Sequence, residues 1–312
     1  MEKILKDIRE KGYISPFRKD AEQYLREFRK APAPPSFAAS EEPRGRVKAI
    51  LAIPSHAARS VLFAARSIIA YIGNPDKSDY TLENPFRALF NKTVRKIRGL
   101  RNLNDLYDNP DLKEDFAYFP LHFEPEFTTL LYAPFYTNQI NLLWQISKSL
   151  PVHFKIYVKE HPSMLEYRPT AYYKELKKIP NLKLVHHKTK SFDLITNSKI
   201  NFVITGTTGM ESALLKKPTI SFGDVFYNTI PSIKRCREIE SLPELVKEQL
   251  EHFRYNDEEI IDFLAAIFED TIPFDYVSLW VSGNYTLAKE SADFPKFVAV
   301  LAKKLNLNRK NQ

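Results

Sequence analysis

The sequence contains a single cysteine, Cys236, among its 312 residues. One cysteine cannot form an internal disulfide or build a cysteine-ligated metal centre, which is typical of a protein kept in a reducing, cytoplasmic compartment. We interpret Cys236 as a packing or surface thiol. We expect no metal site and no tightly bound cofactor.

Long apolar runs are also missing. The longest, residues 61–72, is interrupted by Arg66 and is shorter than the roughly 20 residues that a membrane helix needs. The first residues, Met1 to Asp7, are too charged for the apolar core of a signal peptide. We therefore expect a soluble cytoplasmic protein, with any membrane contact peripheral and on the inner face of the cell membrane.

Several binding motifs are absent as well. No segment ends in the Gly-Lys-Ser/Thr of a Walker loop, and none has the GxGxxG spacing of a dinucleotide-binding turn. Zinc-finger, RNA-binding and basic-zipper signatures are absent too, so nucleic acid is not an expected partner.

The chain does have the composition of a packed protein, with 44% hydrophobic and 13% aromatic residues, and its length suffices for two domains. From residue 116 onward, short apolar runs alternate with helical patterns, which predicts a doubly wound α/β domain. Strands are expected at 116–119, 154–158, 182–185, 201–204 and 219–222, and residues 130–132 are interpreted as part of another.

The segment 201–215 is the most informative. An apolar run ends in a small-residue loop that opens directly into a helical pattern, so free backbone N–H groups point at the space above the sheet and favour a phosphate. The predicted anion-binding residues are Thr205, Gly206, Thr207, Thr208 and Gly209, together with Gly223 after the next strand.

Two further strand ends carry candidate residues. Lys159 and His161 follow the 154–158 strand, and the His161 imidazole could hold a phosphate oxygen; a loop histidine paired with Glu160 is the plain alternative. Glu211, one helical turn past the glycine loop, could accept hydrogen bonds from a ribose, or it could be a helix-surface glutamate.

The segment 120–126 places His122, Glu124 and Glu126 directly after a strand. Such groups could act as acid or base on a ligand bound at the strand end, and His122 and Glu124 are the candidates for that role. A rigid interdomain turn with solvated glutamates is nearly as plausible a reading, since two prolines stiffen the segment.

Positive charge is concentrated in the first third of the chain. Residues 1–110 hold 21 of the 46 Lys and Arg but only 13 of the 38 Asp and Glu. The densest cluster could meet an anionic membrane surface or a polyanionic glycan, or it could be a solvated helix face; it consists of Lys92, Arg95, Lys96, Arg98 and Arg101.

The organisation along the chain follows from these patterns. Residues 1–30 and about 44–106 are mostly helical in pattern, and the proline-rich stretch 31–36 between them is interpreted as a linker. We expect a helical basic connector at 1–115, an α/β domain with an anion site at 116–250, and C-terminal helices at 251–312 that pack back on the connector.

Four motifs in order resemble the bacterial capsular polysaccharide biosynthesis proteins: residues 119–126, 158–162, 205–211 and 217–224. That family includes β-Kdo transferases that build a linker on a lipid, and it is similar to two-domain GT-B glycosyltransferases. The resemblance implies a CMP-activated sugar as donor and a lipid-linked or glycan acceptor. It implies that the 116–250 domain binds the nucleotide sugar, with the 206–209 loop and His161 near the donor phosphate and Glu211 near the ribose.

The sequence departs from that family in one respect. Residues 1–115 show no strand series for the second Rossmann half that would hold the acceptor. We expect either that the chain is shortened, or that the acceptor side is reduced or comes from a partner protein. We expect a glycosyltransferase of capsular polysaccharide synthesis, and the alternatives are a non-catalytic nucleotide-sugar or glycan-binding remnant and a membrane-surface scaffold of the same pathway.

Overall fold

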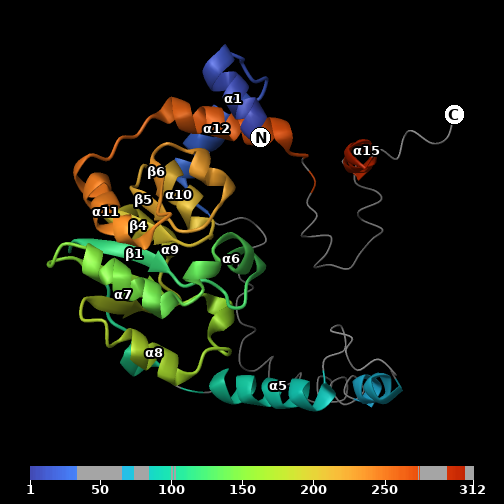
Figure 1. Ribbon diagram of the computed structural model, residues 1–312, viewed down its shortest axis with the longest axis vertical. Coiled ribbons are helices and arrows are strands. Elements are labelled where there is room, and N and C mark those ends of the chain that lie inside the picture. Colours follow the sequence, from blue (N-terminus) through green and yellow to red (C-terminus); the bar gives the residue numbers. More distant parts are fainter. Residues whose placement is uncertain are drawn as a thin grey trace.

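A computed structural model describes residues 1–33, 65–73, 84–99, 101, 103–272, 274 and 294–305. Within them the chain forms one six-stranded sheet of parallel strands with the spatial order β3-β2-β1-β4-β5-β6 (Figure 1). The strands are β1 (Phe116–Pro120), β2 (Lys155–Lys159), β3 (Leu182–Val185), β4 (Ile200–Val203), β5 (Thr219–Ser221) and β6 (Ile233–Arg235).

This strand order is the one found in Rossmann folds, and it confirms the predicted doubly wound α/β class. The order reverses between β1 and β4, which pair with each other although β2 and β3 lie between them in sequence. Ligands of such sheets bind outside the carboxyl ends of the strands at this switch point. The fold therefore directs attention to the loops that follow β1 and β4.

Helices cover both faces of the sheet, because successive strand side chains point to opposite sides. Ala117 and Phe119 of β1 pack in one core cluster with Leu143, while Phe116 and Tyr118 pack in another with Leu194. The first face carries α7 (Gln139–Ser149), α8 (Thr170–Leu176) and α11 (Leu242–Glu251), and the second carries α9 (Ser191–Asn197) and α10 (Thr208–Leu214).

Helices α1 (Glu2–Lys11), α2 (Arg18–Lys30) and α12 (Asp257–Asp270) pack together beyond the β6 side of the sheet. Arg29 of α2 joins three elements there. Its Nε donates to the carbonyl oxygen of Leu214 at 2.8 Å and its Nη2 lies 2.7 Å from Asp257 Oδ1. The start of the chain is thereby fastened to the end of α10 and to the start of α12.

Helix α5 (Pro85–Gly99) lies at the opposite end of the molecule, near α8. Arg95 Nη1 donates to the Tyr167 hydroxyl at 3.0 Å, and its guanidinium lies 4.0 Å from the centre of that ring. Arg98 donates to the Tyr167 carbonyl oxygen, and Arg101 donates to that of Leu165 at 2.8 Å. Three members of the predicted basic cluster thus hold α5 against residues 165–170.

The structure differs from the sequence reading at several elements. Residues 130–132 belong to a helix, α6 (Phe127–Tyr132), and the short strand β6 is not among the strands expected from the sequence. The strand-like run 49–53 falls outside the described residues. The remaining described helices are η2 (Asn104–Leu106), η3 (Pro134–Tyr136), η4 (Pro162–Met164), η5 (Phe226–Thr229), η6 (Ile239–Ser241), α15 (Phe294–Lys304) and a helix at 65–73.

In the part of the chain that the structure describes, no helix combines the length and the apolar character required to cross a bilayer.

We predict that Arg29→Ala lowers the free energy of unfolding by about 2 kcal/mol, because it removes hydrogen bonds to two other helices from a partly buried guanidinium. Arg26→Ala is the matched control on the same helix, since Arg26 is 66% exposed and lies 4.0 Å from Glu22; its effect should stay within about 0.5 kcal/mol. Urea denaturation of both variants measures the difference. Equal effects would contradict the role given to Arg29.

Candidate functional site

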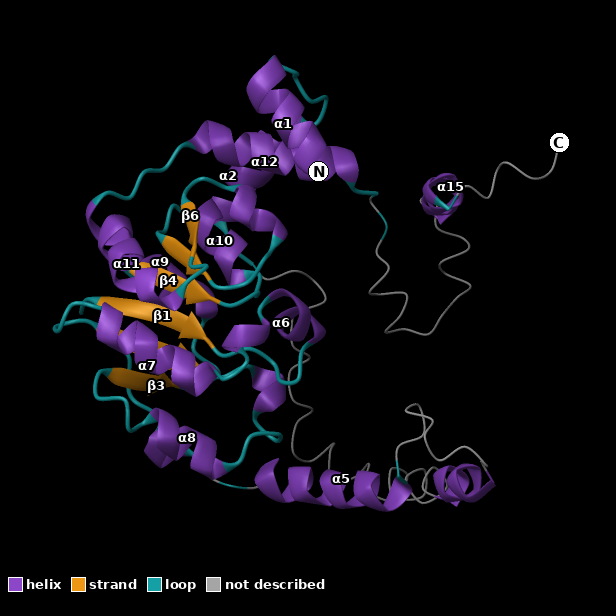
Figure 2. Ribbon diagram, in the orientation of Figure 1, coloured by secondary structure: helices purple, strands orange, loops and turns teal. Residues whose placement is uncertain are grey.

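The loops that follow β1 and β4 meet at the switch point of the sheet. Nε2 of His122, two residues past β1, accepts hydrogen bonds from the backbone N–H of Thr205 at 3.1 Å and of Gly206 at 3.0 Å. Figure 2 shows the arrowhead of β1 directed toward α6 on this side of the sheet. The sequence predicted both loops to be functional, and the structure brings them into direct contact.

The protonation state of His122 follows from these bonds. An imidazole nitrogen that accepts two N–H groups carries no proton, so the neutral ring is protonated on Nδ1. Burial lowers the pKa of His122 to about 4, and the positive charge of Arg168 acts in the same direction, as does His161 when it is protonated. His122 is therefore neutral at physiological pH, and its Nε2 is occupied by the 205–206 backbone.

Two buried side chains that sequence reasoning missed hold the loop after β1. Gln139, in the first turn of α7, accepts from the His122 N–H at 2.8 Å and donates to the Glu124 carboxylate at 2.5 Å. Arg168 donates to the His122 carbonyl oxygen at 2.6 Å and lies 3.1 Å from the second Glu124 oxygen. Both carboxylate oxygens of Glu124 thus have partners, although its side chain is 31% exposed.

Arg168 also forms a buried ion pair with Glu160, at 2.5 Å. The Glu160 carboxylate accepts from the His161 N–H at 2.6 Å and from the Tyr173 hydroxyl at 2.9 Å. Burial raises the pKa of Glu160, while Arg168 opposes that shift by stabilising the charged form. Glu160 is therefore a buried support for the loop after β2, paired with Arg168 as well as with the backbone of its neighbour.

His161 lies exposed at the end of β2. Its Nδ1 accepts from the Ser163 N–H at 3.3 Å, so the neutral ring carries its proton on Nε2. Within the described residues that Nε2 has no hydrogen-bond partner, which leaves it free to donate to a ligand. Partial desolvation lowers the pKa of His161; Glu126 opposes this shift, and Arg168 and Lys159 add to it.

Lys159 is placed differently from the other predicted residues. Its Nζ donates to Ser191 Oγ at 2.7 Å at the start of α9, and burial lowers its pKa to about 8. The ammonium group is thus on the α9 face of the sheet, whereas His122 and Arg168 belong to the loops at the carboxyl edge.

The glycine loop after β4 is closely supported. Thr207 Oγ1 donates to the Glu211 carboxylate at 3.1 Å, and the Tyr227 hydroxyl donates to the Gly206 carbonyl oxygen at 2.7 Å. Glu211 is only 8% exposed, and burial raises its pKa. The structure therefore brings Glu211 into the loop itself, as a partner of Thr207.

Two of the predicted glycines leave no room for a side chain. A Cβ on Gly209 would lie 2.7 Å from the Tyr227 ring, and one on Gly223 would lie 2.5 Å from the Thr205 side chain and 2.7 Å from the Ile204 carbonyl oxygen. Glycine at these positions lets the segments after β4 and β5 and the η5 segment pack together. Thr208 begins α10 beside them.

A groove of about 310 Å³ continues this edge of the sheet. It lies between the first turns of α7 and the segment after β6, and Phe135, Tyr136, Asn138, Arg237 and Glu238 are among its lining residues. Tyr136 packs against Phe222, 5.1 Å between ring centres, and Phe222 directly precedes Gly223. This ring contact links one wall of the groove to the segment that follows β5.

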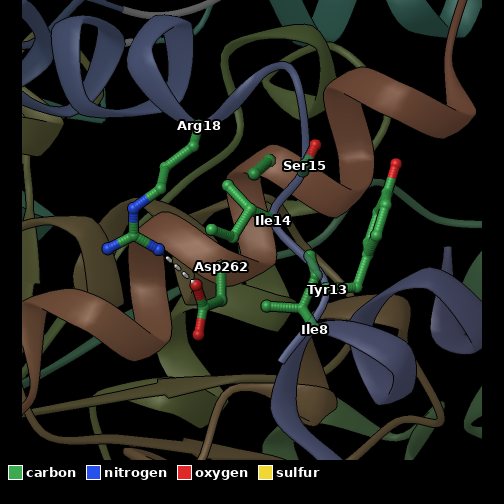
Figure 3. A pocket seen from close by; sticks show the side chains of 7 residues that line it. Ile8, Tyr13, Ile14, Ser15, Arg18 and Asp262 are labelled. Atoms are coloured by element: carbon green, nitrogen blue, oxygen red, sulfur yellow. Dashed lines mark hydrogen bonds and ion pairs between the residues drawn. The ribbon is translucent and has the colours of Figure 1, made fainter. Parts of the chain in front are cut away.

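A second cavity, of about 170 Å³, lies between α1, α2 and α12 (Figure 3). It is lined largely by apolar side chains such as Ile8 and Ile14, and Arg18 beside it is paired with Asp262 at 2.8 Å. These helices lie at the β6 end, away from His122. Among the described residues no three His, Cys, Asp or Glu side chains are grouped as metal ligands.

Comparison with known proteins gave one family match. The model of a family described as capsule polysaccharide biosynthesis protein matches residues 13–231. A search of curated proteins found no match.

Among solved structures, the chain is similar to KpsC of Thermosulfurimonas dismutans, a β-Kdo 2,7 transferase, with 20% identity and a TM-score of 0.35 over 58% of this chain and 63% of that one. It is similar to S. aureus MnaA in a structure with UDP, with 10% identity and a TM-score of 0.34 over 55% and 47% of the two chains. The chain is also similar to WaaG, a glycosyltransferase involved in lipopolysaccharide biosynthesis, with 13% identity and a TM-score of 0.31 over 64% of this chain and 50% of that one. The chain spans less than two thirds of each of these structures.

We predict that protonation of His122 destabilises the folded protein. Its folded pKa of about 4 lies below the value of 6.5 for a free histidine, so the unfolded chain takes up the proton first as the pH falls. The stability that depends on neutral His122 is complete above about pH 6.5 and is lost as the pH falls toward 4, by about 3 kcal/mol.

The measurement is urea denaturation of the wild type and His122→Gln between pH 7 and pH 4. Glutamine keeps an acceptor for the 205–206 backbone but does not titrate. The free energy of unfolding of the wild type should fall by about 3 kcal/mol relative to the variant across this interval. A difference that stays constant with pH would show that His122 is not held neutral.

Proposed function

This chain belongs to the capsule polysaccharide biosynthesis protein family, and from that premise we propose that it is a glycosyltransferase of surface polysaccharide assembly. The donor would be a CMP-linked sugar, CMP-Kdo. The acceptor would be a lipid-linked or growing glycan. The observation that carries the proposal is the meeting of the β1 and β4 loops at the switch point of a Rossmann-type sheet.

The donor phosphate would lie above the 205–209 loop, next to His161. An Nε2–H donor on an exposed neutral ring can bind a phosphate oxygen and stabilise the charge that develops as the nucleotide departs. His122 has a different part in this proposal, because its Nε2 already holds the Thr205 and Gly206 backbone. It would set the shape of the loop that receives the phosphate.

The nucleoside would occupy the groove beside η3. Phe135 lines it and is 93% exposed, so its ring face is available for stacking on a base. The Glu211 carboxylate, held by Thr207, would be the partner of a ribose hydroxyl after a small rearrangement of the Thr207 side chain.

The reaction would be displacement at the anomeric carbon. An acceptor hydroxyl oxygen forms the new bond to that carbon, the bond to the donor phosphate oxygen breaks, and CMP leaves with the bonding electron pair. Glu124 would take the acceptor proton, since it is the partly exposed carboxylate of the β1 loop. The acceptor would be held by a second domain, for which a partner protein is one source.

We predict that CMP and CMP-Kdo raise the melting temperature more than UMP, UDP or GDP do. A ligand that binds only the folded state stabilises it by about 2.7 kcal/mol at a hundredfold excess over its Kd. His161→Ala should reduce the shift, whereas His153→Ala should not, because His153 is 67% exposed and precedes β2 at the amino edge.

The outcomes of this thermal-shift titration separate the functions. A larger shift with UDP or GDP would keep a nucleotide site but overturn the CMP donor. No shift with any nucleotide would overturn the donor site. Binding without sugar transfer in the presence of acceptor and partner would support a non-catalytic binding protein of the same pathway.

A further prediction concerns the base. Phe135→Ala should weaken CMP binding roughly tenfold, the loss expected when one stacked base loses its aromatic partner. Phe127→Ala is the matched control, because Phe127 is 71% exposed on α6 and does not line the groove. Calorimetric titration of both variants tests the site, and equal affinities would place the base elsewhere.

A further inference from the structure

We propose that α5 is an interfacial helix, which docks the protein on an anionic membrane surface through Phe86, Phe90 and Ile97. This inference is independent of the proposed transfer reaction. It also changes which residues of the basic cluster would face the lipid.

The apolar face of α5 is exposed. Phe86, Phe90 and Ile97 are 64%, 68% and 63% exposed, and Leu89 is 56% exposed. Their spacing of four and seven residues places them on one side of the helix. Large apolar side chains grouped in this way are expensive to leave in water and mark an interaction surface.

The opposite side of α5 faces the protein. Arg95 lies about half a turn from the apolar face and is bound to the hydroxyl and the ring of Tyr167. Arg98 and Arg101 bind backbone carbonyl oxygens of the same segment, residues 165–168. These three arginines are therefore engaged within the protein and orient the apolar face of the helix outward.

Charge identifies the occupant as an anionic lipid surface. Helix α5 contains no acidic residue, and Arg87, Lys92 and Lys96 are exposed on it. In the helical projection Arg87 flanks the apolar face on one side and Lys96 on the other. An apolar stripe between basic side chains is the pattern of helices that lie in the plane of a membrane surface. The basic side chains add electrostatic attraction to anionic lipid to the burial of the apolar face.

The test is co-sedimentation of the full chain with phosphatidylcholine vesicles, with and without phosphatidylglycerol. Binding should be stronger to the anionic vesicles and should weaken with salt. The double variant Phe90→Ser/Ile97→Ser should lower the partition coefficient roughly tenfold or more on both vesicle types. Lys96→Glu should lower it roughly tenfold on anionic vesicles and leave binding to neutral vesicles unchanged.

Phe127→Ser is the control, because Phe127 is equally exposed but lies on α6; its binding should equal that of the wild type. The proposal is overturned if the wild type does not sediment with anionic vesicles, if the double variant binds as the wild type does, or if Phe127→Ser loses as much binding. It is also overturned if the wild type is a dimer that the double variant dissociates, since the face then joins two copies of the chain.

The thermal-shift titration with CMP is repeated on the α5 variants. An intact nucleotide response together with lost vesicle binding supports the membrane role of α5 independently of the donor site. Lost vesicle binding together with a lowered melting temperature in the absence of nucleotide would attribute the effect to misfolding, and Lys96→Glu alone would then decide the proposal.

Discussion

The buried guanidinium of Arg168 is the constraint on which the arrangement of the site depends. It joins the Glu160 carboxylate after β2, the Glu124 carboxylate and the His122 carbonyl oxygen after β1, and it lies 4.7 Å from the centre of the Tyr172 ring of α8. The pairing of the parallel strands β1 and β2 does not by itself connect the two loops that follow them. Arg168 supplies that connection, and the position of His122 depends on it.

The connection continues across the switch point. Arg168 holds the carbonyl oxygen of His122 and Gln139 holds its N–H, and from this position the side chain directs Nε2 toward the 205–206 backbone. A buried, unpaired Arg168 would be strongly unfavourable, because the desolvation of a charge has to be offset by close partners. Burial lowers the pKa of His122 and keeps the ring neutral, and the Arg168 charge acts in the same direction. A proton on Nε2 would also face the two backbone N–H donors.

The sequence predicted the strands β1 to β5 because each is a short apolar run bounded by turn residues, and it predicted that loops after β1, β2 and β4 would matter. It could not predict β6, which is three residues long and includes Lys234 and Arg235. The apolar run at 130–132 fits a strand or a helix equally well over so short a length, and it is helical.

The roles of the site residues were harder to predict than their places. The partners of His122 lie 83 and 84 residues away, and Arg168 reaches a carbonyl oxygen 46 residues away. Contacts between residues so far apart along the chain leave no local pattern in the sequence. A histidine next to two carboxylates has the pattern of an acid–base group, and only the tertiary contacts show that its Nε2 is occupied.

The same limit applies to the basic cluster, whose five residues have similar side chains but different environments. The 165–170 segment accepts hydrogen bonds from Arg95, Arg98 and Arg101. Arg101 donates to the carbonyl oxygen of Arg168 itself. One segment therefore holds α5 on its outer side and the Arg168 network on its inner side. If α5 lies on a membrane as proposed, this segment fixes how the carboxyl edge of the sheet is oriented toward the lipid. A lipid-linked acceptor would then meet a site whose height above the bilayer is set by Arg95 and Arg98 of α5 and by Arg101, which follows the helix.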